Sequence, residues 1–223
     1  MGLILQPVVA SRAWLHKASA LVVGLGILFS GHSLAVAATN PFVSLNEIDS
    51  DDLSAFTKWT ALMPRYEAEH AKNSTTCLSK AHCLNLEWER LLSRLSHASI
   101  HQKMASINRF FNAISYVSDE ENYGITDYWQ TPYELMMRGG DCEDYAVAKY
   151  ISLRRLGVPE DQLRIVVVKD QDLGGIVHAV LEVKVEDVTY ILDNQEKKIL
   201  PQANVFHYKP MFAINESKWW AYK

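Results

Sequence analysis

Residues 139–157 read "GGDCEDYAVAKYISLRRLG", and the expected architecture follows from this stretch. The Gly139-Gly140 pair predicts a sharp turn that leaves room for a substrate backbone to approach. Asp141 is a favourable N-cap, and the apolar residues that recur after it at helical spacing predict a helix over 142–156. Gly157 then ends this helix, because glycine readily adopts the left-handed backbone at a helix C-terminus. The stretch therefore predicts a turn followed by a helix whose first residue is a cysteine.

The segments before this helix also have helical periodicity. Apolar residues recur every three to four positions in three of them, which predicts amphipathic helices over 51–63, 86–95 and 100–117. We expect Pro64 to end or kink the first helix, because proline lacks the backbone N–H that a helix interior needs. Residues 119–129 mix polar and aromatic side chains and predict a loop.

The segments after the helix are short, rich in β-branched residues and partly alternating. They predict strands over 163–168, 178–185 and 189–193. Helices followed by strands indicate an α+β fold. We expect one domain over residues 39–223, mainly helical over 39–157 and mainly β over 158–223.

Cys142 stands at the first position of the predicted helix, flanked by three carboxylates. Backbone N–H groups and the helix dipole stabilise an anion at this position, which would lower the pKa of the thiol. Asp141, Glu143 and Asp144 oppose this effect, because negative neighbours disfavour a thiolate. On this stretch alone, a nucleophile and a buried inert cysteine are equally acceptable interpretations.

The predicted strands add a histidine and an aspartate. In the 178–185 strand, His178 lies on the face opposite Ala179, Leu181 and Val183, so we do not expect a core histidine. If Glu186-Asp187 forms a two-residue turn, Val185 pairs with Val188 and Val180 with Asp193. His178 and Asp193 are then diagonal neighbours on one face, within reach of each other. This inference depends on an even register, since a shift of one residue would separate them.

A cysteine at a helix start, a histidine and an aspartate together suit thiol acyl chemistry. Cys142 is the candidate nucleophile, His178 the base and Asp193 the group that orients the imidazole. The backbone N–H of Cys142 is a natural oxyanion donor. For the second donor the sequence offers only Trp129 and Gln130, and packing is the favoured role of Trp129.

Residues 1–38 are typical of a secretory signal peptide. Arg12 and Lys17 precede an uncharged apolar run over 18–29, and small residues over 33–38 form a cleavage region. An uncleaved anchor is the alternative, although the run is shorter than the roughly 20 residues that span a bilayer. Removal of the segment leaves 20 basic and 26 acidic residues, a net charge of −6. We therefore expect an exported chain without a membrane span and without nucleic acid as a partner.

Cys77 and Cys83 lie close together in "CLSKAHC". An oxidising compartment favours a disulfide between them, which would leave Cys142 free. A metal site that uses His82 is the alternative interpretation of this stretch.

The sequence resembles the bacterial transglutaminase-like cysteine proteases of LapG type. The resemblance rests on "DYWQTPYELMMRGGDCEDYAVAKYISLRRLG", "HAVLEV" and "YILDNQ", with "INRFFNAISYVSD" and "YKPMFAINESKWW" as further similar segments. It implies a papain and transglutaminase-like fold, and a periplasmic, calcium-dependent endopeptidase. Such proteins cut the N-terminal region of a large surface adhesin, commonly after a pair of alanines, and so release the cell from a biofilm. An inner-membrane receptor that senses cyclic di-GMP holds the protease back.

The resemblance also implies roles for particular residues. Cys142, His178 and Asp193 match the catalytic triad, and Asp141 and Glu143 match the calcium-binding acids, with Asp144 as a third. Calcium would reduce a local charge of about −3 to about −1, and unit charges about 4 Å apart interact by roughly 4 kcal/mol at an effective dielectric near 20. The alternative is that the three acids only cap the helix.

Two other functions remain compatible with the sequence. The first is a different thiol acyl-transfer enzyme, either a transglutaminase or a peptidoglycan amidase. The second is a calcium-binding module in which Cys142 is inert.

Overall fold

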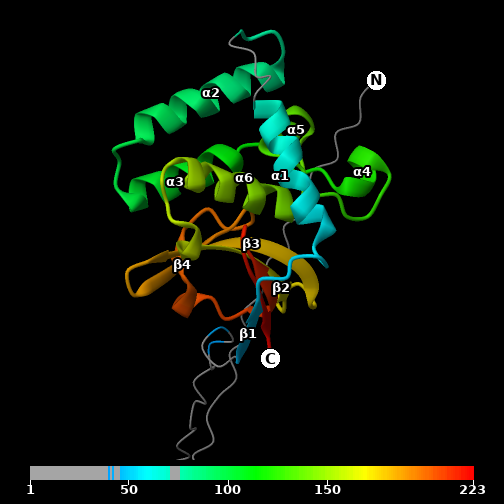
Figure 1. Cartoon of the computed structure of the whole chain (residues 1–223), viewed down its shortest axis with the longest axis vertical. Coiled ribbons are helices and arrows are strands. Elements are labelled where there is room, and N and C mark those ends of the chain that lie inside the picture. The colour runs from blue at the N-terminus through cyan, green and yellow to red at the C-terminus, as the bar shows by residue number, and fades with distance from the viewer. Residues whose placement is uncertain (1–39, 41, 43–45, 71–75) are drawn as a thin grey trace, which may run out of the picture. The chain divides into compact units, whose positions relative to one another are not determined.

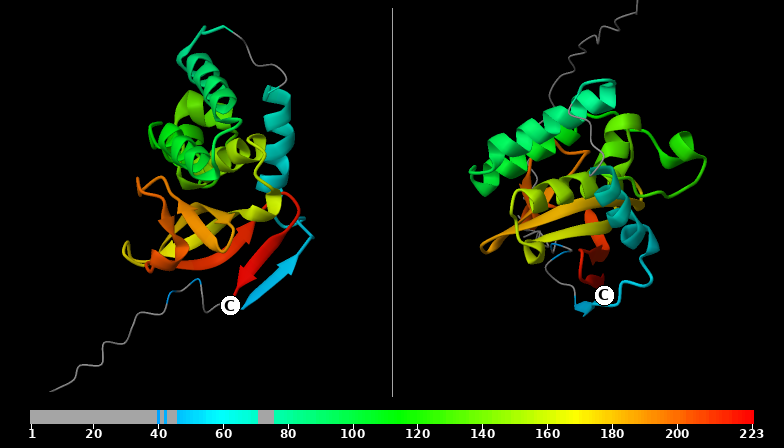
Figure 2. Two further views of the ribbon diagram at one scale, coloured as in Figure 1. Left: turned by 90° about the vertical axis from the view of Figure 1, so that its left-hand side faces the viewer. Right: turned by 45° about the horizontal axis from the view of Figure 1, so that its top comes forward.

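A seven-stranded antiparallel sheet forms one layer of the molecule, and helices cover one of its faces (Figures 1 and 2). The computed structural model describes residue 40, residue 42, residues 46–70 and residues 76–223. These residues lie in one compact unit within 38–223. The mixed helix and antiparallel-sheet architecture confirms the predicted α+β fold.

The helices precede most of the strands along the chain. The helices are α1 (Thr57–His70), α2 (Lys80–Leu95), α3 (Ile100–Phe111), α4 (Asp119–Tyr123), α5 (Pro132–Arg138) and α6 (Cys142–Arg155). The strands are β1 (Glu47–Ser50), β2 (Leu163–Asp170), β3 (Ile176–Val185), β4 (Val188–Leu192), β5 (Leu200–Pro201), β6 (Tyr208–Ile214) and β7 (Trp219–Tyr222). Their order in the sheet is β1-β7-β6-β2-β3-β4-β5.

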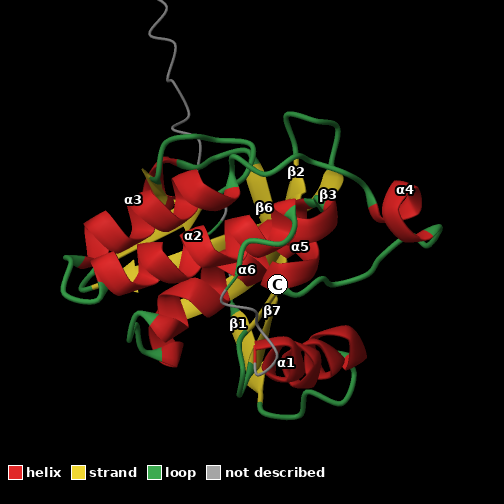
Figure 3. Ribbon diagram, turned by 90° about the horizontal axis from the view of Figure 1, so that it is seen from above, coloured by secondary structure: helices red, strands yellow, loops and turns green. Residues whose placement is uncertain are grey.

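Helix α6 is the central element of the helical layer, as the view from above shows (Figure 3). Every residue over 144–153 is buried, so the helix is enclosed on all sides rather than on one stripe. Its buried Ser152 hydroxyl accepts a hydrogen bond of 2.9 Å from the indole N–H of Trp88 in α2. The cysteine at the start of α6 is therefore mounted on a helix that the rest of the fold encloses.

The face of the sheet away from the helices is also covered. A second apolar cluster lies there, formed by Val166, Val168, Val180, Ile191, Val205, Tyr208, Ala213 and Trp220. His178 is only 1% exposed on this side, so the expectation that it would not be a buried histidine is wrong. The alternating pattern of the strand identified the two faces correctly, but it could not show that later segments cover the second face.

The predicted helix over 51–63 is wrong at both ends. Backbone N–H groups of Asp52 and Ser54 bond to the side chains of Ser50 and Asp52 at 3.1 and 3.0 Å, which holds this segment in turns. Helix α1 begins only at Thr57 and continues through Pro64 to His70. A proline inside a helix costs about 3 kcal/mol, and the packing of the α1 side chains against the core outweighs this cost.

The other predicted helices differ from the structure at their ends. Helix α2 begins at Lys80 rather than at 86, after an N-cap at Ser79. Helix α3 ends at Phe111 rather than at 117, because the N–H of Val117 bonds to the Gly140 carbonyl at 3.0 Å. The segment predicted as a loop contains the short helix α4, and α5 follows it.

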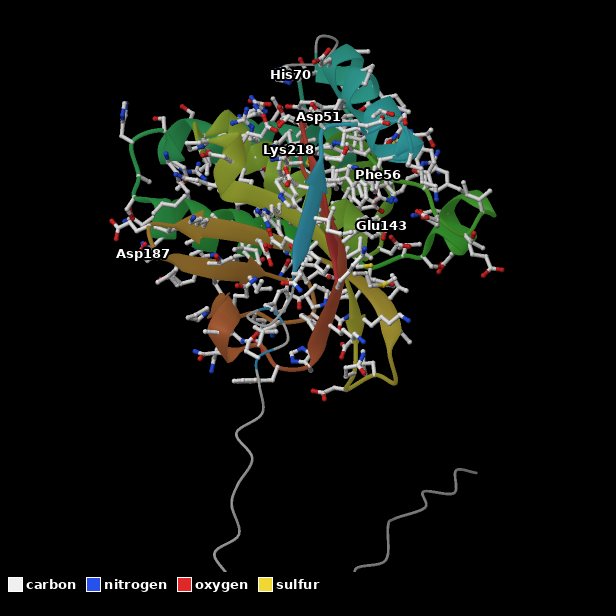
Figure 4. All side chains as sticks on the ribbon, turned by 60° about the horizontal axis from the view of Figure 1, so that its bottom comes forward. Asp51, Phe56, His70, Glu143, Asp187 and Lys218 are labelled. Carbon is white, nitrogen blue, oxygen red and sulfur yellow. A yellow bond between two sulfur atoms is a disulfide. The ribbon has the colours of Figure 1, made fainter. Side chains whose placement is uncertain are left out.

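The ends of the described chain meet at one edge of the sheet. β1 pairs with β7, and Lys218 beside β7 forms an ion pair with Asp49 of β1 at 2.8 Å. Figure 4 labels Lys218 and also Phe56, whose ring packs against Phe212 and Trp219. Trp219 therefore packs within the fold.

Cys77 and Cys83 form a disulfide with Cα atoms 4.6 Å apart, which confirms the predicted pair and leaves Cys142 as the free thiol. The His82 ring lies 3.1 Å from the hydroxyl of Ser79. The predicted signal segment, 1–38, lies outside the described residues. In the part of the chain that the structure describes, no helix has the length and apolar character needed to cross a bilayer.

Candidate active site

Cys142 is the first residue of α6, as predicted, and Asp141 is its N-cap. The N–H of Asp141 donates to the Asp144 carboxylate at 3.1 Å, which fixes the first turn of the helix. The Cys142 thiol donates a hydrogen bond to Glu143 Oε2 at 3.3 Å, and the backbone N–H of Ala179 in β3 lies close enough to act on the thiol and favour a lower pKa. Ala179 pairs with Val167 of β2, but the pairing of β3 with β4 begins only at Leu181, so Ala179, the neighbour of His178, has no strand partner on its β4 side.

His178 and Asp193 form the hydrogen-bonded pair that the hairpin register predicts. Val185 pairs with Val188, and Asp187, labelled in Figure 4, lies in the two-residue turn between β3 and β4. The resulting register brings His178 Nε2 to 3.0 Å from Asp193 Oδ1. Both side chains are less than 5% exposed, so the pair is shielded from water.

Two further residues, which the sequence did not suggest, form hydrogen bonds with this pair. The Tyr208 hydroxyl in β6 donates to Asp193 Oδ2 at 2.5 Å. The backbone N–H of Gln195 donates to Asp193 Oδ1 at 2.9 Å, and its side-chain amide lies 3.2 Å from His178 Nδ1. Burial alone would raise the pKa of Asp193, but the hydrogen bonds from His178 and Tyr208 outweigh it and lower that pKa. Asp193 is therefore held as a carboxylate that orients the imidazole.

A buried lysine lies on the helical side of the same pair. Lys149 in α6 is fully buried, and its ammonium nitrogen has no hydrogen-bond partner. Burial lowers the pKa of Lys149 to about 7, although the nearby Asp193 carboxylate acts in the opposite direction.

The thiol lies in a cluster of acids that extends beyond its own helix. Asp119, Asp141 and Asp144 have carboxylate oxygens within 4.8 Å of one another, and Asp119, Asp127 and Glu143 do so too. The three acids predicted to bind a metal thus lie around Asp119, the residue that both groups share. Asp127 also forms an exposed ion pair with Lys58.

Burial and mutual repulsion disfavour charge throughout this cluster. Burial first, and then Asp141, raise the pKa of Glu143 to about 9 and that of Asp119 to about 7. The pKa of Asp144 is well above its ordinary range for the same reason, with Glu143 as the main charged neighbour. The pKa of Cys142 is also raised, by burial and then by Glu143 and Asp141. Without a counter-charge, the thiol is therefore held in its protonated, unreactive form.

The cluster contains unsatisfied oxygens that a cation could use. Oδ1 of Asp119 and Oδ1 of Asp141 are buried and have no hydrogen-bond partner. Their second oxygens accept backbone N–H groups, Asp141 from Asp119 at 3.3 Å and Asp119 from Tyr128. Buried oxygens without partners are unusual, and carboxylate oxygens are the preferred ligands of calcium. The residues therefore fit a hard divalent cation, which capping of α6 alone would not explain.

The glycine pair has one of its two predicted roles. Gly139 has a φ of 79°, so the sharp turn is present and requires glycine. The predicted room for a substrate backbone is wrong, because the chain itself fills that space. A Cβ at Gly140 would collide with the Asp144 carboxylate and the Gln130 amide, and one at Gly139 would collide with the Ser115 carbonyl.

The two suggested oxyanion donors are both engaged in the scaffold. The Gln130 side-chain amide donates to the Gly139 carbonyl at 3.1 Å, and its backbone N–H donates to Asp144 at 2.7 Å. Trp129 belongs to the main core and packs edge-on against Trp59, which confirms the packing role. Both residues support the turn that carries Cys142.

Local sequence contained a signal for only some of the missed residues. Gln195 follows Asp193 by two positions, and "SDEEN" after Val117 has the N-cap and acidic first turn of a short helix that begins at Asp119. Tyr208 had no such signal, because β6 was not predicted.

Comparison with known proteins identifies the family. The sequence matches the bacterial transglutaminase-like cysteine proteinases (BTLCP) over residues 73–222. The fold is similar to Legionella pneumophila LapG in its calcium-bound form, with a TM-score of 0.60 and 29% identity over 72% of this chain and 87% of that one. It is also similar to LapG treated with EGTA, with a TM-score of 0.59 and 30% identity over 72% of this chain and 85% of that one. No curated protein sequence matches the chain. The chain belongs to the bacterial transglutaminase-like cysteine proteinase family.

Proposed function

We propose that this protein is a calcium-dependent endopeptidase in which Cys142, His178 and Asp193 form the catalytic triad. One observation carries the proposal: the Cys142 sulfur lies against the N–H of Ala179, next to the buried His178–Asp193 pair. A thiol at a helix start beside an oriented imidazole is the arrangement that nucleophilic catalysis by cysteine requires.

The residues divide the work as follows. Nε2 of His178 is engaged by Asp193, so Nδ1 is the nitrogen that takes the thiol proton, after the exposed Gln195 side chain moves aside. The Cys142 sulfur attacks the peptide carbonyl carbon, and the tetrahedral oxyanion is stabilised by the Cys142 N–H. His178 returns the proton to the leaving amine as the C–N bond breaks and a thioester forms. Water then gives a proton to His178 and hydrolyses the thioester, which releases the acid and regenerates the thiol.

Calcium is the proposed cation of the acidic cluster. Asp119, Asp141, Glu143 and Asp144 would hold it, with Asp119 as a ligand beyond those that the sequence suggested. When bound, the ion supplies positive charge that offsets the carboxylates beside the thiol. The two buried oxygens without partners support a cation at this position. The similarity to calcium-bound LapG supports calcium as the identity of that cation.

The substrate, location and partners extend the same proposal. The resemblance of the sequence motifs implies that the protein acts in the periplasm on the N-terminal region of a large surface adhesin and promotes release from a biofilm, and the similarity to LapG supports this proposal. An inner-membrane receptor that senses cyclic di-GMP sequesters it.

Mass spectrometry of a digested adhesin fragment tests the proposed function. An N-terminal fragment of a candidate adhesin is incubated with the protein in calcium, in excess EGTA, and in EGTA followed by calcium. We expect a single new N-terminus with calcium, none in EGTA, and recovery when calcium is restored. Cys142→Ala is the matched control and should give no product.

Other products would overturn the assignment. Glutamine-donor peptides and muropeptides are tested in parallel, so that amine incorporation or amide cleavage in these would reveal a transglutaminase or an amidase. Full cleavage of the fragment by a calcium-stripped sample would remove the metal from the mechanism.

A further inference from the structure

A groove is lined by residues of α2, α3 and α5 and of the segments that follow α3 and α5, and none of the proposed triad residues lines it. Figure 3 shows these three helices from above. Its volume is about 720 Å³. Ligand-binding cavities are commonly about 300–1,000 Å³, so the groove is large enough to bind part of a second molecule. No step of the proposed reaction uses it.

The groove is strongly basic in a chain that is acidic as a whole. Five basic side chains and one acidic side chain line it: Lys80, Arg90, Arg94, Arg109, Arg138 and Glu87. The remainder of the sequence must therefore be more acidic than the total charge of −4 indicates. A local concentration of positive charge attracts an acidic partner.

Three of these arginines form no ion pair with a carboxylate among the described residues. They are Arg90, Arg94 and Arg109, and all three are exposed. Arginines elsewhere behave differently. Arg155 pairs with Glu89 at 2.7 Å, and Arg164 pairs with Glu47 at 2.9 Å. The arginines of the groove thus keep their bidentate donors available for another molecule.

Apolar side chains lie between the basic ones. They are Leu84, Leu91, Phe110, Ile114, Met136 and Met137. Met137 is 47% exposed and Phe110 is partly buried. An apolar floor with a basic border matches a polypeptide that presents apolar and acidic side chains together, rather than a small inorganic anion.

One end of the groove reaches the turn that carries the reactive thiol. Gly139 and Ser115 line this end. Tyr116, next to Ser115, forms a β-bridge with Gly140, two residues before Cys142. A polypeptide bound in the groove can therefore continue toward the sulfur.

We propose that the groove is a docking site for an acidic, partly apolar segment of the polypeptide substrate, outside the bond that is cleaved. This inference rests on the proposed endopeptidase function and specifies its substrate class. Docking through arginines would select chains that carry such a segment and raise the local concentration of the cleavable bond near Cys142.

Peptide binding tests the groove without any need for catalysis. The probe is a fluorescein-labelled peptide of alternating Glu and Leu residues, and its partner has Gln in place of every Glu. Anisotropy is measured with the Cys142→Ala protein in calcium. We expect the acidic peptide to bind at least about tenfold more tightly than the Gln peptide. We also expect added salt to weaken it, because exposed charges are screened.

Two sets of variants locate the binding. Arg90→Glu/Arg94→Glu/Arg109→Glu should weaken acidic-peptide binding by at least about tenfold. The neutral set Arg90→Gln/Arg94→Gln/Arg109→Gln should give a smaller loss, and circular dichroism melting checks that both sets fold. The matched control is Lys169→Glu/Lys184→Glu/Lys209→Glu, which makes the same change in charge at exposed positions on the sheet. Equal losses in the arginine and lysine sets, or equal affinity for the two peptides, would overturn the proposal.

A cleavage assay separates this inference from the proposed function. An adhesin fragment is compared with a copy in which its acidic residues outside the cleavage site are changed to their amides. We expect KM to rise for the amide copy and for the arginine variant, with kcat unchanged. If the peptide binds but no fragment is ever cut, the endopeptidase function fails and the groove binds something other than substrate. Cleavage with the same KM in every case would overturn docking while leaving the endopeptidase function in place.

Discussion

The candidate active site has an ordered half, the His178–Asp193 pair at the sheet, and an acidic half, the carboxylates around Cys142. The two halves are stabilised in opposite ways. At the sheet, Asp193 accepts hydrogen bonds from His178, Tyr208 and Gln195, and its carboxylate is fully satisfied. At the start of α6, acids crowd around Cys142, and Oδ1 of both Asp119 and Asp141 has no partner. Burial disfavours the charged form of the acid in both halves, but hydrogen bonds from His178 and Tyr208 outweigh it for Asp193, whereas for Asp144 the charge of Glu143 adds to it.

This contrast indicates which half is ready before anything binds. Hydrogen bonds to a buried carboxylate fix both its charge and its position, so the His178–Asp193 pair is organised by the fold itself. The acidic half has the residues for chemistry but the wrong electrostatics, since its charges disfavour the thiolate. A cation is the component that the second half needs and the first does not.

The largest effect is expected in the ordered half, from Asp193→Asn. An amide cannot hold the imidazole in the same tautomer, and the corresponding change in a serine protease triad costs about 10⁴-fold in kcat. We expect the rate of adhesin-fragment cleavage to fall by about 10³- to 10⁴-fold, measured in saturating calcium.

Tyr208→Phe provides a graded control for this result. It retains the carboxylate and removes one of its donors, so we expect a loss on the order of tenfold. Tyr190→Phe alters only an exposed contact of 3.4 Å with His101 and should leave the rate unchanged. An Asp193→Asn protein with near-normal activity would contradict the role of Asp193.

Calcium should stabilise the whole molecule through the acidic half. A ligand at about 100 times its Kd adds about 2.7 kcal/mol to the free energy of unfolding. For a chain of this size, 1 kcal/mol corresponds to about 2–4 °C in Tm. We therefore expect calcium to raise Tm by roughly 5–10 °C relative to EGTA in scanning calorimetry. Magnesium at the same concentration serves as the control, and an equal shift with both ions would show a non-selective effect.

Lys149 should give the ordered half a measurable pH dependence. The pKa of Lys149 is about 7 in the folded protein, whereas it is about 10.4 in an unfolded chain. Between these values the unfolded chain binds more protons, so stability rises with pH. We expect the free energy of unfolding to rise by about 1–2 kcal/mol more between pH 7 and pH 8.5 in the native protein than in Lys149→Met. The free energies are measured by urea unfolding. If they change with pH by the same amount in the native protein and in Lys149→Met, the pKa of Lys149 is not lowered in the folded protein.

The smallest effect is expected from Asp119→Asn. Asparagine retains an oxygen for the Tyr128 N–H and replaces the unpartnered oxygen with a donor that can face Asp141. Relief of repulsion should raise the Tm of the calcium-free protein by about 2–4 °C, equivalent to about 1 kcal/mol. The same change should reduce the stabilisation by calcium. A lower Tm in EGTA would contradict the view that the acids repel one another.

The sequence predicted the site well where the contacts are local. The hairpin has a two-residue turn, so counting from Glu186-Asp187 was sufficient to bring His178 to Asp193. The position of Cys142 followed equally from the N-cap and the glycines before it. These features depend on neighbours within a few residues or on one short turn.

The remaining features depend on long-range packing. The Tyr208 contact requires β6 to pair with β2, a connection that no nearby residue specifies. Asp119 joins the acids of α6 across 22 positions through the bond between its N–H and Asp141. Pro64 was expected to end or kink a helix, and only the core packed against α1 shows why the helix continues through it.

The reactivity of the single free thiol tests the central claim most directly. The rate at which iodoacetamide alkylates Cys142 is measured by mass spectrometry against pH, in calcium and in EGTA. Because the cation offsets the acids beside the sulfur, we expect calcium to raise the rate at pH 7 by at least about tenfold. We also expect the pH midpoint of the reaction to be lower in calcium. Identical rate profiles in calcium and in EGTA would contradict the claim that the acidic half needs a cation to make its thiol reactive.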